Sequence, residues 1–213
     1  MEYRVNEIFE SIEGEGVRAG LPCLFIRLVG CNLRCPYCDT AYAFEPSETD
    51  EVLTELELAE CAQASGLRAV TLTGGEPLAH AVDPLLDALV AVGCTVNVET
   101  NGSLPLPPAR AGVFYTMDWK APSSGCADAM LAANLDRLTC DDVLKFVVAN
   151  KEDLDAARAL LSDYDIKAQV FFSPVFDAIN PRKIAEYLVK HRLEARLQLQ
   201  LHKIIWDSDA RGV

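Results

Sequence analysis

Short apolar runs alternate with amphipathic segments along most of the 213-residue chain. Runs rich in β-branched and aromatic side chains predict strands, whereas apolar residues at a helical spacing predict helices. The predicted strands cover 23–29, 68–73, 94–100, 113–119, 143–149, 167–173 and 195–201. The predicted helices cover 50–65, 83–93 and, more briefly, 127–138, and two more begin at Asn150 and at the pair Asn180 and Pro181.

Turn and capping residues mark where the helices begin and end. Ser47 or Thr49 can cap the first predicted helix. Asp83 can cap the second, with Pro84 in its first turn and Gly93 at its end. Acceptor side chains favour helix starts, proline suits the first turn, and glycine suits the residue after the last turn.

Strands that alternate with helices favour parallel pairing and an α/β fold. The chain has no internal repeat, low-complexity stretch or linker, so residues 1–213 are expected to form a single domain. Because a closed eight-stranded barrel typically needs roughly 250 residues, the expected fold is an open or partial (β/α) barrel with mostly parallel strands. Functional loops in such folds follow the carboxyl ends of the strands. Here these loops are 30–40, 73–77, 99–103 and 173–176.

Charge narrows the classes of partner. Lys plus Arg number 19 and Asp plus Glu number 32, which gives a net charge of -13. This balance argues against binding to a nucleic-acid backbone or an anionic membrane, although a few converging basic groups can still bind a small anion. The first 30 residues carry several charges, and no apolar run approaches a membrane span. We therefore expect a cytoplasmic protein without disulfides.

Three cysteines stand close together in the loop after the first predicted strand. Cys31, Cys35 and Cys38 form C-x3-C-x2-C, with no second pair to complete a closed four-ligand zinc site. Three thiolates can instead hold three corners of a four-iron cluster and leave the fourth iron open. The spacing favours the cluster over zinc. Because the other cysteines occur singly among mostly apolar residues, we expect core packing for them. They are Cys23, Cys61, Cys94, Cys126 and Cys140.

A glycine-rich loop, Thr73 to Pro77 (TGGEP), follows the next predicted strand. Its glycines allow a ligand to approach the backbone, and strand-end carbonyls together with Glu76 can accept hydrogen bonds from an ammonium group. A tight turn explains this loop equally well when it is considered alone.

Together these loops resemble the radical S-adenosylmethionine superfamily, whose signature has an aromatic residue, here Tyr37, before the last cysteine. Five segments narrow the resemblance to the 7-carboxy-7-deazaguanine synthase family. They are 9–16, 25–40, 71–77, 99–103 and 200–203. The resemblance implies a [4Fe-4S] cluster that cleaves S-adenosylmethionine reductively. It also implies radical ring contraction of 6-carboxy-5,6,7,8-tetrahydropterin with loss of ammonia, a carbon–nitrogen lyase reaction of queuosine and deazapurine biosynthesis. A magnesium ion, an external electron donor such as flavodoxin or ferredoxin, and a homodimer are implied as well.

The resemblance also implies roles for individual residues. Cys31, Cys35 and Cys38 would hold the cluster, and Thr40 would bind magnesium. The residues implied for S-adenosylmethionine are Tyr37, Cys38, Asp39, Gly75, Glu76, Lys120, Ser123, Ser173, Pro174, Val175 and Phe176. Those implied for the pterin are Ile12, Glu13, Gly14, Arg27, Thr73, His202 and Val213. Without the resemblance, Glu13 would be interpreted as a solvated turn residue and Thr40 as a turn cap.

Arg27 also stands out from the residues alone. It lies within an apolar strand, where a charge must be paired or face a cavity. Alternation along the strand puts it on the face of Phe25, opposite Ile26, so we expect it to point into the barrel and bind a substrate carboxylate. The alternative is a structural salt bridge to Glu13 or Glu99.

Two features leave alternatives open. Many family members end shortly after the segment that corresponds to 200–203, whereas this chain continues through 204–213, so contacts of its C-terminal segment are not settled. A glycyl-radical activase would share the cysteine loop but lack the segments 11–16 and 200–203. A zinc or electron-transfer module would lack enzymatic activity, and a zinc protein would be colourless.

Overall fold

The computed structural model describes residues 1–213 and contains one nine-stranded sheet. The strands are β1 (Glu2–Ile12), β2 (Pro22–Leu28), β3 (Glu51–Thr54), β4 (Ala69–Gly74), β5 (Thr95–Thr100), β6 (Val113–Asp118), β7 (Val143–Val148), β8 (Gln169–Pro174) and β9 (Arg196–Leu197). Their order is β3-β1-β2-β4-β5-β6-β7-β8-β9. Strand β1 pairs antiparallel with β2 and β3, and every later pair is parallel. Since β3 and β9 are free edges, the sheet is an open barrel, which confirms the predicted fold class.

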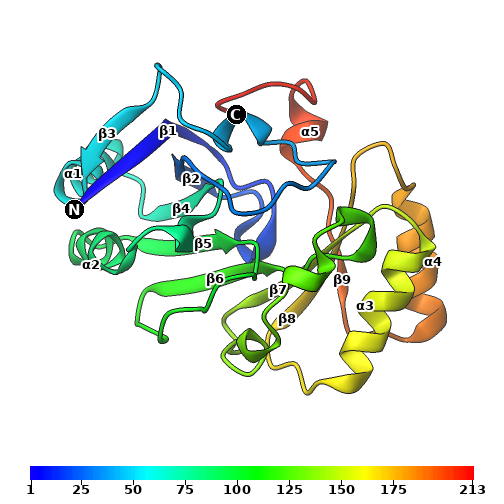
Figure 1. Cartoon of the computed structure of the whole chain (residues 1–213). Helices are drawn as coiled ribbons and strands as arrows, with labels where there is room; N and C mark the ends of the chain where they lie inside the picture. Colours follow the sequence, from blue (N-terminus) through cyan, green and yellow to red (C-terminus); the bar gives the residue numbers. More distant parts are fainter.

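Helices pack along the outside of this sheet (Figure 1). They are α1 (Glu55–Ser65), α2 (Asp83–Ala91), α3 (Lys151–Asp163) and α4 (Pro181–His191), whereas the short α5 (His202–Ile205) contributes His202 and Lys203 to the cavity. A core of 33 buried residues includes Leu24, Ile26 and Leu28 of β2 and Leu85, Leu86 and Leu89 of α2. No helix is both long enough and apolar enough to span a membrane.

The helix predicted for 50–65 begins later than expected. Glu51–Thr54 instead forms β3, which pairs with the start of β1. Thr54, not Ser47 or Thr49, caps α1: its hydroxyl accepts a hydrogen bond from the backbone N–H of Glu57 at 3.3 Å, and the Glu57 carboxylate accepts from the Thr54 N–H at 2.8 Å. Pairing with β1 keeps these residues extended until this reciprocal cap starts the helix.

The other helix boundaries follow the sequence closely. Asn150 and Asn180 cap α3 and α4 as predicted, because their side chains accept from Asp153 N at 3.0 Å and Arg182 N at 2.9 Å. Asp83 is the first residue of α2 rather than its cap, and Gly93 lies just beyond the helix with a φ of 88°.

Three predictions were wrong because tertiary contacts decide the backbone. Strand β1 was not predicted; its pairing partners β2 and β3 hold it extended. The segment 127–138 contains two isolated 3₁₀ turns instead of a helix, and the buried Asn134 amide there binds the carbonyls of Gly102 and Leu104. Strand β9 is only two residues long, because the chain then crosses to the loop after β1, where Leu201 N–H donates to Gly14 O at 3.1 Å.

Candidate functional site

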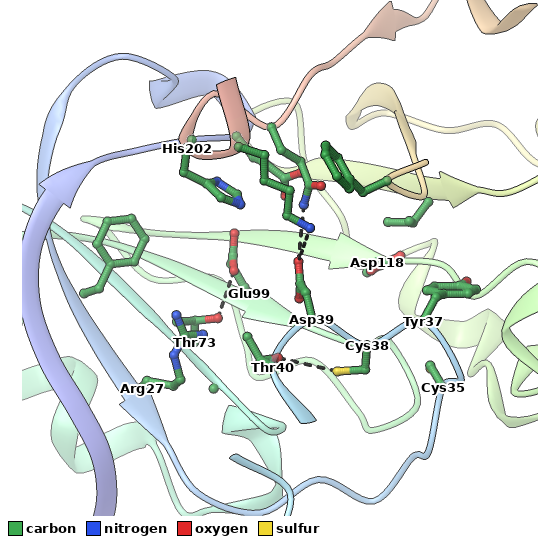
Figure 2. Close-up of a pocket in the computed structure, with 18 of the residues that line it drawn as sticks. Arg27, Cys35, Tyr37, Cys38, Asp39, Thr40, Thr73, Glu99, Asp118 and His202 are labelled. Carbon is green, nitrogen blue, oxygen red and sulfur yellow. Dashed lines mark hydrogen bonds and ion pairs between the residues drawn. The ribbon is translucent and has the colours of Figure 1, made fainter. Parts of the chain in front are cut away.

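A cavity of about 770 Å³ opens at the carboxyl ends of the strands. Successive side chains of a strand point to opposite faces of the sheet, and those on one face form the wall of the cavity. Arg27, Thr73, Glu99, Asp118 and Lys145 come from β2, β4, β5, β6 and β7 and line the cavity, whereas the residue before each of them belongs to the core. Figure 2 shows these strands with Arg27, Thr73 and Glu99 on one side and Cys35, Tyr37 and Asp118 on the other. Glu99, Asp118 and Lys145 were not among the predicted site residues. The alternation of polar and apolar residues along β5, β6 and β7 was the sequence signal that could have found them.

Gly74, the last residue of β4, and Gly75 bring their loop into main-chain contact with the cysteine loop. A Cβ atom at Gly74 would overlap the backbone of Leu28, and one at Gly75 would overlap the carbonyl of Gly30. This close approach allows Gly75 N–H to donate to Leu28 O at 2.9 Å and Glu76 N–H to donate to Gly30 O at 2.7 Å. Glycine is therefore required here by the neighbouring chain segment itself.

Glu76, a predicted cofactor residue, is not among the residues that line the cavity. Its carboxylate is fully buried and accepts hydrogen bonds from Thr100 Oγ1 at 2.7 Å, Asn101 N at 2.6 Å and Leu78 N at 2.9 Å. Burial raises its pKa, and these donors oppose that shift. The side chain holds the ends of β4 and β5 together, and its contact with the cofactor stays a prediction.

Cys31, Cys35 and Cys38 line one side of the cavity as half-buried free thiols. Two donors point at the Sγ atom of Cys31: Leu33 N–H at 3.4 Å and Asn101 Nδ2 at 3.8 Å. No three His, Cys, Asp or Glu side chains are close enough to hold a single metal ion. Three separated thiols with nearby donors fit an iron–sulfur cluster, in which each thiolate binds a different iron, better than one zinc ion.

A fourth cysteine lies next to this set. Cys126 Sγ is 3.9 Å from Cys35 Sγ. Burial raises the pKa of Cys35 to about 12, and Cys126 adds to the shift. The prediction of core packing for Cys126 was therefore wrong, because the loop after β6 brings it to the cysteine loop. That prediction is confirmed for the buried Cys23 and Cys94, whereas Cys140 is exposed and Cys61 is half-buried.

Several residues predicted for cofactor binding converge near Cys35. Tyr37, Asp39 and Lys120 line the cavity, as do Gly75 and residues 174–176. The Tyr37 hydroxyl and one oxygen of Asp118 are buried without a hydrogen-bond partner. Burial, with Asp118 nearby, raises the pKa of Tyr37 to about 12. Two unpartnered polar atoms beside the thiols are suited to a polar ligand.

Besides Glu76, two predicted cofactor residues do not line the cavity. Ser123 donates from its N–H and its hydroxyl to Asp153, at 2.9 and 2.6 Å, and so joins its loop to α3. Ser173 is buried and donates to Glu15 Oε1 at 3.2 Å. Both side chains make structural hydrogen bonds, and their contact with the cofactor stays a prediction.

Buried ion pairs line the cavity floor. Lys145 Nζ lies 2.8 Å from Glu15 Oε2, and Lys120 Nζ lies 2.8 Å from Asp118 Oδ2. Burial alone would lower the pKa of Lys145, but Glu15 and other carboxylates raise it well above the usual value. Each ammonium therefore stays charged and is already paired.

On the opposite side, Ile12, Glu13 and Gly14 line the cavity as predicted. Glu13 is buried, not a solvated turn residue: its carboxylate accepts from Thr71 and lies 3.7 Å from Arg18 Nη2. Burial, and then Glu99, raise its pKa to about 7. Arg18 was missed, since its short loop gave no sign that it would be buried under the sheet.

Arg27 faces the cavity from β2, on the face that alternation predicted. Its Nε donates to Glu7 Oε1 at 2.7 Å, so its ion-pair partner is neither Glu13 nor Glu99. Its guanidinium also lies 5.8 Å from the ring centre of Tyr42, whose hydroxyl donates to the same Glu7 oxygen at 3.1 Å. Arg27 therefore combines the two features that were predicted as alternatives: it lines the cavity, and it forms a salt bridge, although with Glu7.

The remaining predicted residues also line the cavity. Thr40 Oγ1 lies 3.5 Å from Cys38 Sγ, and Thr73 Oγ1 donates to Glu99 Oε2 at 2.9 Å (Figure 2). His202 starts α5 rather than ending a strand, and burial lowers its pKa. Val213 and the segment before it reach the cavity, which settles the position of the C-terminal segment.

Comparison with known proteins agrees with this geometry. The Radical SAM superfamily profile matches residues 25–140. The chain is 39% identical over 221 residues to a 7-carboxy-7-deazaguanine synthase of Clostridium acetobutylicum, covering 100% of each chain. It is 41% identical to the protein of that name from Chlorobaculum tepidum, covering 98% and 96%. A crystal structure of QueE from Escherichia coli superposes with a TM-score of 0.80 at 27% identity and covers 94% of each chain.

Proposed function

We infer the reaction of this protein from the family to which it belongs: the chain is a member of the 7-carboxy-7-deazaguanine synthase family within the radical SAM superfamily. We propose that it converts 6-carboxy-5,6,7,8-tetrahydropterin to 7-carboxy-7-deazaguanine, with contraction of the ring and loss of ammonia. The observation that carries the proposal is the placement of three free thiols on one side of a polar cavity, with Arg27 on the other.

The cysteine side of the cavity would hold the cofactors. Cys31, Cys35 and Cys38 would ligate the [4Fe-4S] cluster, which with S-adenosylmethionine supplies one-electron chemistry that forms a 5'-deoxyadenosyl radical. The Tyr37 hydroxyl and the Oδ1 atom of Asp118, both without a hydrogen-bond partner, are available to polar groups of S-adenosylmethionine. Gly75 allows close approach, and the loop 174–176 would cover the bound cofactor from the side of β8.

The other side would hold the pterin. Ile12, Glu13 and Gly14 offer backbone groups at one wall. Thr73 and His202 would contact the rings, and Arg27 would bind the carboxylate through its planar guanidinium. The interior thus orients the substrate toward the cysteine side, while the cofactor supplies the radical chemistry.

Magnesium would bind at Thr40, which lies between the thiols and the substrate side (Figure 2). One hydroxyl supplies one hard oxygen ligand, so substrate and water must complete the shell. We expect Thr40→Ala to weaken magnesium stimulation of product formation and to leave visible absorption and S-adenosylmethionine affinity unchanged. A magnesium titration of the rate measures this, and unchanged stimulation would rule out the role.

The reaction also defines partners and surroundings. An external one-electron donor such as flavodoxin or ferredoxin is needed to reduce the cluster. A reducing cytoplasm would keep the thiols free, and we propose a homodimer from the family likeness. Sedimentation of the cluster-loaded protein tests the dimer.

One experiment tests the activity directly. The cluster-loaded protein is incubated anaerobically with a chemical reductant, S-adenosylmethionine and 6-carboxytetrahydropterin. Mass spectrometry should find 7-carboxy-7-deazaguanine, and omission of the pterin should remove it. Because this product differs from the substrate only by the loss of ammonia, the abstracted hydrogen atom must be returned, so the deazaguanine should exceed any 5'-deoxyadenosine formed. Cofactor cleavage without deazaguanine formation would assign the protein to another radical reaction.

A further inference from the structure

The C-terminal segment 208–213 adds a cation to the cavity wall. All of its residues line the cavity, and the end of the chain lies near the loop after β2 (Figure 1). Arg211 Nη2 donates to Asn6 Oδ1 at 3.1 Å, and the Arg211 guanidinium lies 3.6 Å from the ring centre of Tyr42. Arg211 thus connects the segment to β1 and to the 3₁₀ turn that carries Tyr42.

The positively charged side chains of the cavity do not all have a carboxylate of their own. Five lysine and arginine side chains line it, and three of them face a carboxylate of their own. These pairs are Lys120 with Asp118, Lys145 with Glu15 and Lys203 with Asp39, at 2.8, 2.8 and 3.3 Å. Glu7, in contrast, is shared by two arginines: Arg27 Nε lies 2.7 Å and Arg211 Nη2 lies 3.9 Å from its oxygens. Around Glu7 the cations therefore outnumber the carboxylates.

The arginines also have unused donors. Arg27 makes its hydrogen bond through Nε alone, so both of its terminal nitrogens have no hydrogen-bond partner. Arg211 uses only Nη2. A guanidinium fork with free N–H groups matches the two oxygens of a carboxylate, and shared aromatic contact with Tyr42 keeps the two cations near each other despite their repulsion.

The two arginines differ in exposure. The side chain of Arg27 is 12% exposed, within the wall, whereas that of Arg211 is 52% exposed. An anion that enters the cavity can therefore meet a fixed cation on β2 and a second cation on a surface segment. Because this protein carries a net charge of -13, two converging guanidiniums also offset the long-range repulsion of an anionic ligand.

We propose that Arg211 is a second carboxylate-binding residue of the substrate site, and that a carboxylate bridging Arg27 and Arg211 closes the segment 208–213 over the cavity. The inference rests on the proposed function, because it takes the pterin carboxylate as the ligand. It assigns to the C-terminal segment a role in selecting carboxylated substrates, apart from the cofactor chemistry.

Binding without turnover tests the proposal. Calorimetry on the anaerobic, cluster-loaded protein, without reductant, compares 6-carboxytetrahydropterin with 6-methyltetrahydropterin, which lacks the carboxylate. Arg211→Gln should weaken binding of the carboxylated ligand about tenfold and leave the methyl ligand unchanged, and Arg211→Lys should recover part of the loss. Arg182→Gln is the matched control, because Arg182 is 82% exposed and pairs with Glu186 on α4; it should bind both ligands as the wild type does.

Two outcomes would overturn the proposal. Equal losses for the two ligands would show that Arg211 only packs the segment, and unchanged binding would show that it does not contact the carboxylate. Hydrogen exchange gives a second measurement: 6-carboxytetrahydropterin should slow exchange in 204–213 of the wild type and have little effect in Arg211→Gln. If the wild type forms the product but Arg211→Gln binds both ligands as the wild type does, only the role of Arg211 is overturned. Absence of deazaguanine would overturn the proposed reaction.

Discussion

On the cysteine side of the cavity, backbone contacts fix the structure, and on the opposite side charged side chains do. The cysteine loop 30–40 and the loop 73–77 touch through main-chain hydrogen bonds that only glycine permits at Gly74 and Gly75. The side formed by β1, β2 and 208–213 is connected through Glu7, Arg27 and Arg211. We call these the cofactor side and the substrate side.

The difference suggests a division of labour. A cluster needs ligands at fixed positions, and backbone packing cannot rearrange without disrupting the sheet. A substrate must enter and leave, and Arg211, whose side chain is 52% exposed, can exchange partners at small energetic cost, whereas the Arg27–Glu7 pair is mostly buried. Substitutions on the cofactor side should therefore act in an all-or-none manner, and those on the substrate side should act in a graded manner.

The largest effect is expected for the cluster ligands. Replacing Cys31, Cys35 or Cys38 by Ala should abolish the visible absorption and the reductive cleavage of S-adenosylmethionine, because a corner of the cluster loses its thiolate. Iron content and absorption spectra measure this. Cys61→Ala and Cys140→Ala are the controls, since neither residue lines the cavity. Loss of the cluster in Cys61→Ala would contradict the three-ligand assignment.

Gly75→Ala tests whether backbone packing fixes the cofactor side. Its Cβ would overlap the carbonyl of Gly30, so the cysteine loop must shift, at a cost of about 1–3 kcal/mol, and iron content should fall strongly. Gly66→Ala is the control, because Gly66 has a φ of 71° but open space around it. That variant should lose about 1 kcal/mol of stability to backbone strain and retain its iron. Full iron content in Gly75→Ala would remove the distinction between the two sides.

Glu13 gives the substrate side a pH dependence. Its pKa is raised from 4.5 to about 7, chiefly by burial. The folded state thus holds this proton more tightly than the unfolded state, so the stability contribution is complete below about pH 4.5 and is lost as the pH rises to about 7. Between pH 5 and pH 8 the wild type should lose about 2–3 kcal/mol more than Glu13→Gln, measured by urea unfolding. The exposed Glu10→Gln should keep the wild-type slope, and an unchanged slope in Glu13→Gln would refute the shift.

The smallest of these effects concerns Arg27. Arg27→Lys keeps the charge but loses the fork, so the KM for 6-carboxytetrahydropterin should rise about tenfold, or about 1.4 kcal/mol. Cluster content and S-adenosylmethionine affinity should not change. An unchanged KM, or loss of stability in place of substrate affinity, would mean that Arg27 serves only its salt bridge to Glu7.

Local patterns in the sequence predicted most strands and part of the residues that line the cavity. Alternation on β2 correctly assigned Arg27 to the face opposite Ile26. The same reasoning failed where a side chain serves a distant segment. The glycine-rich loop of Glu76 gave no sign that Thr100 and Asn101, at the end of another strand, would donate to its carboxylate. Cys126 was predicted to pack in the core because it occurs singly in the sequence, but the fold brings its Sγ atom to 3.9 Å from Cys35 Sγ.

The sequence by itself determined the periodicity of the strands, the spacing of the three thiols and the glycines between loops, because these depend on the geometry of a few consecutive residues. Only the tertiary structure decided which charges meet. Lys145 and Glu15 are 130 residues apart, and Arg211 is 205 residues from Asn6. Such pairs depend on which strand ends the sheet brings together and on where the chain crosses after β9. No local pattern records those choices, because they arise from strand order and from burial of the whole chain.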